Sequence, residues 1–213
     1  MKKWLFIFLV ITLCIYLVLK INTNQKINIA CIGDSNTEGH GLFPKFWYSY
    51  PSKLQLFLGN KYRVYNYGEA GTCVASSDVN NYQNSLSFEK SLLLKHDYFI
   101  FLLGTNDSKD YRDGFFQAYE NLLDNYDIRG KKNVIICTPP VAFSNKWGIQ
   151  NEILSTEIRR SILKIAVKND FKILDIQSEM KSEIYYQSDG IHFNAKGTER
   201  IAQILKNKLF DNQ

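Results

Sequence analysis

The chain has 213 residues, of which 45% are hydrophobic and 22% charged, a balance that fits one globular domain with a sizeable core. Of its 26 basic residues, three flank an apolar run near the N-terminus, and the others nearly balance the 21 acidic ones. The sequence contains no dense Lys/Arg stripe of the kind that nucleic-acid binding needs, so we expect no nucleic-acid partner.

The cysteines indicate neither a disulfide framework nor a zinc site. They stand at positions 14, 31, 73 and 137, without a Cys-x-x-Cys pair. His-Glu-x-x-His and similar ligand spacings are missing from the sequence as well. We therefore expect an activity that needs no metal and no cofactor.

An apolar run opens the chain. Two lysines precede an uncharged stretch from Trp4 to Leu19, which ends at Lys20. At about 1.5 Å per residue the stretch is slightly short for a hydrocarbon core of about 30 Å, although Lys20 can snorkel. No small-x-small site follows, which favours a retained anchor over a cleaved signal peptide. We predict a membrane anchor and short linker over residues 1–25. The domain, residues 26–213, is then outside the cell membrane, or secreted if the segment is cleaved.

From residue 26 onward, short apolar runs alternate with segments of helical spacing. The apolar runs predict strands over residues 27–32, 62–67, 98–103, 133–137 and 171–176. The other segments predict helices over residues 50–58, 82–94, 115–126, 151–167 and 195–209. This alternation indicates an α/β fold, a three-layer α/β/α sandwich with a five-stranded parallel sheet and a site at the carboxyl ends of the strands.

Four polar clusters stand directly after predicted strands or before the last helix. They are Gly33-Asp34-Ser35, Asn66 to Gly71, Gly104 to Asp107 and Asp189 to His192. Taken singly, each has a plain interpretation as a helix cap or a turn. Because the carboxyl ends of parallel strands meet at one edge of the sheet, we expect the four clusters to lie together.

Jointly, the clusters hold every group that acyl transfer needs. Ser35 is the candidate nucleophile, His192 is the base that takes its proton, and Asp189 orients the imidazole. The backbone N–H groups of Ser35 and Gly71 and the side-chain amide of Asn106 can converge on the developing oxyanion. The sequence therefore predicts a serine hydrolase site.

These blocks resemble the SGNH hydrolases, a subgroup of the GDSL esterases and lipases named for the serine, glycine, asparagine and histidine of four sequence blocks. The resemblance spans about residues 27–209 and implies a flavodoxin-like hydrolase fold, an acyl-enzyme intermediate, and the same roles for the residues above. Asn36 departs from the family, which usually carries an apolar residue there. Residues 50–59 and 103–108 are similar to carbohydrate O-acetylesterases, including sialate O-acetylesterase-like proteins, which implies an acetylated sugar as substrate.

Other functions stay open at this point. The same acyl-enzyme can pass its acyl group to a sugar hydroxyl, which would make the protein a polysaccharide O-acetyltransferase. An arylesterase, a lysophospholipase and a catalytically inactive glycan-binding module are further alternatives, and the sequence does not indicate an oligomeric state. The ordinary α/β-hydrolase fold is excluded, because its serine stands in Gly-x-Ser-x-Gly midway through the sheet, whereas Ser35 follows the first strand and is followed by Thr37 at the second glycine position.

Aromatic residues gather in two predicted loops. Trp47 belongs to the aromatic-rich segment 40–50, and Trp147 follows the fourth strand. Aromatic faces can stack on sugar rings, so both tryptophans are candidate substrate-binding residues; the alternative is that they pack a helix against the sheet. His40 and His96 have no acidic residue placed as Asp189 is, and we predict both as loop or surface residues.

Overall fold

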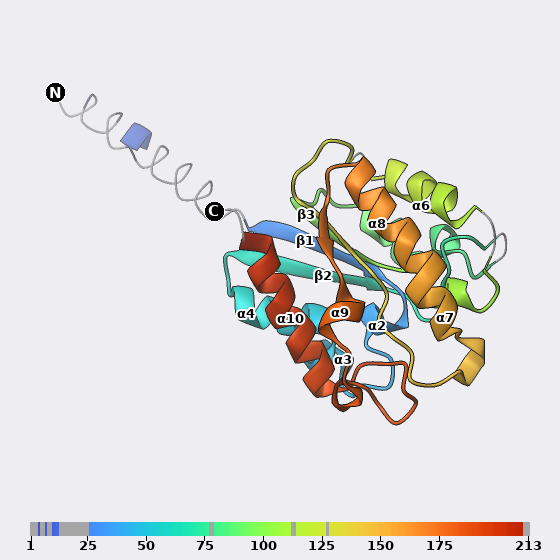
Figure 1. Ribbon diagram of the computed structural model, residues 1–213. Coiled ribbons are helices and arrows are strands. Elements are labelled where there is room, and N and C mark those ends of the chain that lie inside the picture. The colour runs from blue at the N-terminus through green and yellow to red at the C-terminus, as the bar shows by residue number, and fades with distance from the viewer. Residues whose placement is uncertain are drawn as a thin grey trace.

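A computed structural model describes residues 26–76, 79–111, 114–126 and 128–210, together with Trp4, Ile7 and residues 10–12. Within these residues, five parallel strands form one sheet in the order β2-β1-β3-β4-β5 (Figure 1). The strands are β1 (Ile27–Gly33), β2 (Tyr62–Gly68), β3 (Tyr98–Leu102), β4 (Val134–Cys137) and β5 (Lys172–Leu174). The predicted α/β fold with a five-stranded parallel sheet is confirmed. The chain reverses its direction of travel across the sheet between β1 and β3, where sheets of this type place their ligands.

Helices connect the strands and cover both faces of the sheet. They are α2 (Ser35–Glu38), α3 (Lys45–Tyr48), α4 (Tyr50–Leu58), α5 (Leu86–Leu92), α6 (Phe115–Asp124), α7 (Asn151–Ile153), α8 (Arg159–Lys168), α9 (Ile176–Glu179) and α10 (Ala195–Phe210). Short 3₁₀ helices are η1 (Tyr82–Asn84), η2 (Asn106–Ser108), η3 (Lys146–Gly148) and η5 (Glu183–Tyr185). The π-helical segment η4 (Leu154–Ile158) joins α7 to α8.

Alternate residues of each central strand face two separate cores. In β1, Ala30 and Ile32 pack into the core under α6 and α8, whereas Ile29 and Cys31 pack into the core under α4 and α10. Figure 1 shows these two helix layers on opposite sides of the sheet. Because both faces are covered, the central strands need an apolar residue at every position, which explains why their sequences show no polar alternation.

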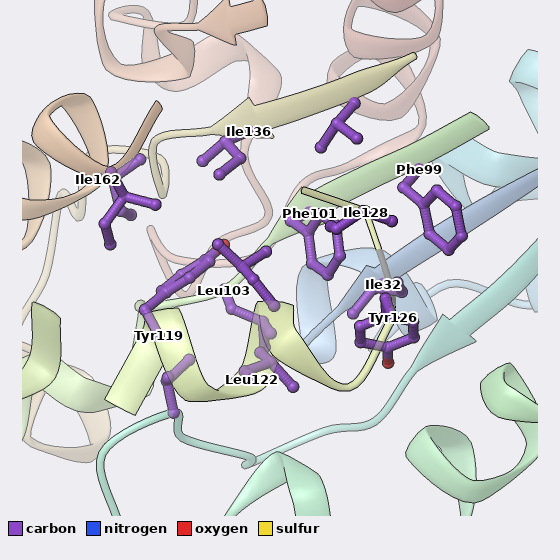
Figure 2. Packing of buried hydrophobic residues seen from close by; sticks show 14 of the residues in the cluster. Ile32, Phe99, Phe101, Leu103, Tyr119, Leu122, Tyr126, Ile128, Ile136 and Ile162 are labelled. Carbon is purple, nitrogen blue, oxygen red and sulfur yellow. The ribbon is translucent and has the colours of Figure 1, made fainter. Parts of the chain in front are cut away.

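The core under α6 and α8 is rich in aromatic rings (Figure 2). The ring centroids of Phe99 and Phe101 in β3 lie 5.8 Å and 5.4 Å from that of Tyr126. Tyr119 and Leu122 of α6 are fully buried in the same core. Burial of an apolar side chain of this size contributes about 1.5–3 kcal/mol, so the core gives the strand ends a rigid support.

The ends of the predicted elements lie within two residues of those in the structure, but three elements differ in their interior or lose much of their length. The helix predicted over 82–94 divides into η1 and α5, because the Ser85 hydroxyl accepts the N–H of Phe88 and starts a new helix. The helix predicted over 151–167 contains the π-helical turn η4. The fifth strand is shorter than predicted, because the chain turns at Asp175 into α9.

The predicted membrane anchor falls mostly on residues outside the described part of the chain. Among the residues that the structure describes, no helix combines the length and the apolar character that crossing a membrane requires.

Candidate active site

Ser35 is the first residue of α2 and follows β1 almost directly. Asp34 caps the helix, because its side chain accepts the backbone N–H of Asn36 at 2.9 Å. Gly33 makes the tight turn possible: a Cβ at this position would lie 1.9 Å from Oγ1 of Thr37. Asp34 is therefore the residue that caps the helix, and the hydroxyl of Ser35 is not used for capping.

The side chains of Ser35, His192 and Asp189 form one continuous hydrogen-bonded chain. Nε2 of His192 lies 2.9 Å from Oγ of Ser35, and Nδ1 lies 2.9 Å from Oδ2 of Asp189. The other carboxylate oxygen of Asp189 accepts the backbone N–H groups of Ile191 at 2.8 Å and His192 at 2.9 Å. Ser35 is 7% exposed and His192 is 6% exposed. This is the order of groups in which an imidazole can take a proton from a serine hydroxyl.

Burial and hydrogen bonds set the charges of the two ionisable groups. Burial acts to raise the pKa of the Asp189 carboxyl, but the hydrogen bonds from His192 and Ile191 outweigh it and hold the pKa below its ordinary value. Burial lowers the pKa of His192, against the opposing hydrogen bond and charge of Asp189. At neutral pH the carboxylate is therefore charged and the imidazole is neutral, which is the state that can accept a proton.

Asn36 joins the serine turn to the histidine loop. Its buried side chain accepts the backbone N–H of Phe193 through Oδ1 at 3.2 Å. An apolar residue at this position could not accept that hydrogen bond. The departure from the family pattern thus has a structural role beside His192, which the sequence alone did not indicate.

Asn106 and Gly71 lie at the ends of the strands on either side of β1. Asn106 begins η2 after β3, and its buried amide donates to the carbonyl oxygen of Thr72 at 3.0 Å. A side-chain amide carries two N–H groups, so a second donor remains. Gly71 has φ +81°, and a Cβ there would meet no heavy atom of the described residues within 4 Å. A glycine is favoured at this position because of its positive φ, and not because a side chain would lack space.

Asp107 fixes the loop that carries Gly71. Its buried carboxylate accepts the backbone N–H groups of Val74 at 2.9 Å and Ala75 at 2.7 Å. The loop after β2 is thereby tied to the loop after β3, next to the Asn106 bond to Thr72. The two predicted oxyanion donors are therefore held by a shared network.

The structure places the two candidate tryptophans in different surroundings. The ring centroid of Trp147, in η3, lies 5.2 Å from that of His192. Trp47, in α3, lies 5.9 Å from Phe46 and lines a separate cavity of about 300 Å³ with residues of α4 and β2. Of the two, Trp147 is the one that packs beside His192.

The histidines outside the predicted site lie in loops as predicted, but each makes a contact that was not predicted. His40 is exposed as predicted, but its ring centroid lies 4.5 Å from that of His192. His96 lies in the loop between α5 and β3, which agrees with the prediction of a loop or surface residue, but it is buried, and its Nε2 lies 3.0 Å from the hydroxyl of Tyr67. Neither position carries a signal in the sequence, because each contact joins residues that are distant along the chain.

Metal chemistry was not expected from the sequence. Within the described ranges, no three or more His, Cys, Asp or Glu side chains are grouped so that they could hold a metal ion.

The comparison with known families identifies the chain. The model of the GDSL-like lipase/acylhydrolase family matches residues 31–200. The chain belongs to this family. The resemblance seen in the sequence blocks is thus confirmed, because this family is the one that the blocks indicated.

Relatives and solved structures agree with this assignment. An acetylxylan esterase from Xylanibacter ruminicola is 31% identical over 204 residues, which are 85% of this chain and 42% of that protein, so the chain spans less than half of this relative. Est24, a carbohydrate acetylesterase from Sinorhizobium meliloti, superimposes with a TM-score of 0.69 at 20% identity, covering 86% of this chain and 98% of Est24. The aryl esterase of M. smegmatis has a TM-score of 0.70 at 20% identity, covering 88% and 100%. At this identity the two structures show the shared fold of the GDSL-like hydrolase.

Proposed function

We propose that the protein is a serine esterase that removes acetyl groups from carbohydrate. The observation that carries the proposal is the continuous hydrogen-bonded chain from Ser35 through His192 to Asp189 at the carboxyl ends of the strands. The acetylated sugar is supported by the likeness to an acetylxylan esterase and to Est24, a carbohydrate acetylesterase.

In the proposed reaction, Oγ of Ser35 attacks the ester carbonyl while its proton passes to Nε2 of His192. The backbone N–H groups of Ser35 and Gly71 and the amide of Asn106 stabilise the oxyanion. The intermediate collapses, the alcohol leaves with the proton from Nε2, and an acyl-serine remains. Water then attacks the acyl-serine, passes its proton to Nε2, and releases the acid and Ser35. Throughout, Asp189 holds the Nδ1 proton and stabilises the imidazolium.

A small cavity beside Asn106 supports a short acyl group. Its volume is about 170 Å³, and its walls combine the small side chains of Cys73 and Ala75 with polar and charged ones, among them Asn106, Lys109 and Asp110. Pockets for larger ligands usually measure about 300–1,000 Å³. A chain of two carbons fits such a space better than a fatty acyl chain.

A panel of esters tests the proposal with the purified protein. We expect acetylated xylosides and p-nitrophenyl acetate to be hydrolysed with kcat/KM at least about tenfold above p-nitrophenyl octanoate and a lysophospholipid, since each unaccommodated methylene costs about 1 kcal/mol or more. Free acetate and acetylated acceptor sugar are measured in the same reactions, which separates hydrolysis from acyl transfer. Preference for the octanoate or the lysophospholipid would contradict the proposal.

The activity should persist to a lower pH than an ordinary histidine would allow. His192 must be neutral to accept the serine proton, so activity rises as pH increases through its pKa. Because burial lowers that pKa, the midpoint of kcat/KM for p-nitrophenyl acetate should fall below about 6.5, the ordinary histidine value. A midpoint at pH 7 or above would contradict this assignment.

Two buried carboxyl groups titrate in the pH range in which we expect His192 to titrate, so the pH profile needs a control. Burial raises the pKa of Asp34 to about 6 and that of Asp107 to about 6. A raised carboxyl pKa stabilises the folded state at low pH, and this contribution is lost as pH rises through about 6, so these groups do not unfold the protein in the acid limb. The Asp107→Asn variant should keep the same midpoint if His192 sets it.

A further inference from the structure

Two exposed aromatic rings pack against the imidazole of His192. The ring centroids of His40 and Trp147 lie 4.5 Å and 5.2 Å from that of His192, and 6.3 Å from each other. Trp147 remains 49% exposed, whereas His192 is 6% exposed. The two rings therefore border the imidazole where it meets the surface.

The backbone at Trp147 adopts a conformation that is rare for a bulky residue. Its φ is +57°, in the left-handed region that L residues avoid and that often marks functional sites. The surrounding loop is tied at both ends. The Ser144 hydroxyl donates to the carbonyl oxygen of Asp189 at 2.5 Å, and the N–H of Gln150 donates to Oγ of Ser108 at 3.2 Å. The fold thus holds the indole beside His192 at a conformational cost.

The position of these rings matches the path of the alcohol in ester cleavage. The alcohol leaves with a proton from Nε2 of His192, so it must pass close to this imidazole. In the proposed function, the acyl side of the ester lies in the cavity beside Asn106. The rings of His40 and Trp147 border the imidazole through which the alcohol exchanges its proton.

We propose that Trp147 and His40 form an alcohol subsite, which holds the sugar ring whose hydroxyl carries the acetyl group. This inference rests on the proposed function and extends it to the leaving group. The rings of His40 and Trp147 meet edge to face, at 89°, so they form a corner rather than a parallel slot for a flat aryl group. A pyranose can stack one C–H face on the indole, and the ammonium group of Lys146, 4.7 Å from the centroid of that ring, can donate to sugar hydroxyls.

The subsite has a consequence for acyl transfer. The step that expels a sugar alcohol is the reverse of the step in which a sugar alcohol attacks the acyl-serine. A ring held against Trp147 is therefore placed equally well to leave and to attack. Added acceptor sugar should compete with water for the acyl-enzyme through the same residues.

Two acetyl esters that differ only in the alcohol test the proposal with the purified protein. The substrates are ethyl acetate and a monoacetate of methyl β-D-xylopyranoside, assayed by acetate release. In the Trp147→Ala variant we expect KM for the sugar ester to rise roughly tenfold, the loss of one stacked aromatic contact, while kcat/KM for ethyl acetate changes less than about twofold. His40→Ala should act in the same direction. Trp47→Ala is the matched control, an exposed tryptophan on the other cavity, and should leave both esters unchanged.

Three results would overturn or separate the proposals. An equal loss on both esters, with the acid limb moved to higher pH, would mean that the rings only shield His192, and would overturn the subsite. Unchanged kinetics in Trp147→Ala would overturn it as well. If neither ester were hydrolysed by the wild-type protein, the proposed function would fail. Calorimetric binding of methyl β-D-xylopyranoside that is lost in Trp147→Ala and kept in Trp47→Ala would then still support the subsite, and equal binding in both would overturn it.

Discussion

Replacing Ser35 with alanine should abolish ester hydrolysis and leave the domain folded. The substitution removes the only oxygen of this side chain that can attack the ester, and losses on the order of 10⁶ in kcat are typical when a serine nucleophile is removed. Hydrolysis of p-nitrophenyl acetate at saturating substrate measures the effect. The fold should survive, because the hydrogen bond that is lost joins Ser35 to another side chain, that of His192, and not to the backbone. Alanine is also well suited to the first turn of α2.

A second buried serine gives the matched control. Ser91, in α5, donates to the carbonyl oxygen of Phe88 and lies 2.8 Å from the hydroxyl of Tyr126. Ser91→Ala should lower the melting temperature about as much as Ser35→Ala, by a few degrees for the loss of about 1 kcal/mol, and should retain full activity. If Ser35→Ala kept more than about 1% of wild-type turnover, Ser35 would not be the nucleophile.

Replacing Asn106 with alanine should reduce kcat by roughly 10² to 10³, with a smaller change in KM. Removal of one oxyanion donor typically has this effect, because the donor acts on charge that appears only in the transition state. Steady-state kinetics on p-nitrophenyl acetate give both constants. A loss of less than about tenfold would remove Asn106 from this role.

The Asn106 prediction needs a control for loop movement. The amide of Asn106 also holds the carbonyl of Thr72, so alanine could act by loosening the loop that carries Gly71. Asp107→Asn weakens the anchoring of the same loop through Val74 and Ala75 and leaves the amide donor in place. If loop anchoring were the whole effect, the two variants would lose activity equally; we expect Asp107→Asn to lose markedly less.

The sheet could be predicted because each strand carries a strong local signal. β3 and β4 are continuous apolar runs, as is β1 from Ile29 onward, and the structure buries these runs on both faces as they require. Alternation of strands and helices predicts that the sheet is parallel, whereas the order of the strands was implied only by the flavodoxin-like fold of the resemblance. Local pattern and tertiary packing agree at these positions, so little further information was needed.

The interiors of two helices could not be predicted for a different reason. The π-helical turn η4 preserves the helical pattern of apolar residues, so periodicity cannot distinguish it from an α-helix. The break between η1 and α5 depends on whether the Ser85 hydroxyl accepts a backbone N–H or faces solvent. Side-chain geometry decides these local helix conformations, and it cannot be predicted from residue type alone.

The candidate site was predictable wherever the chemistry itself restricts the residue type. Ser35 follows β1, and Asp189 and His192 lie in the loop before α10. The structure brings them within hydrogen-bonding distance, although their roles in catalysis stay predictions. The neighbours of His192 were not predictable in this way. Trp47 and Trp147 look alike in the sequence, and His40 shows no partner at all, because only the folded loops decide which ring reaches the imidazole.

The bond between Ser35 and His192 joins residues that are 157 positions apart, close to the two ends of the folded domain. During synthesis, the serine turn emerges long before the histidine loop and α10 that supports it. A growing chain therefore contains the proposed nucleophile, Ser35, before the proposed base, His192, has been synthesised. A chain that ends between Leu174 and Asp189 contains all five strands but lacks the candidate base and α10, so we expect it to hydrolyse no ester.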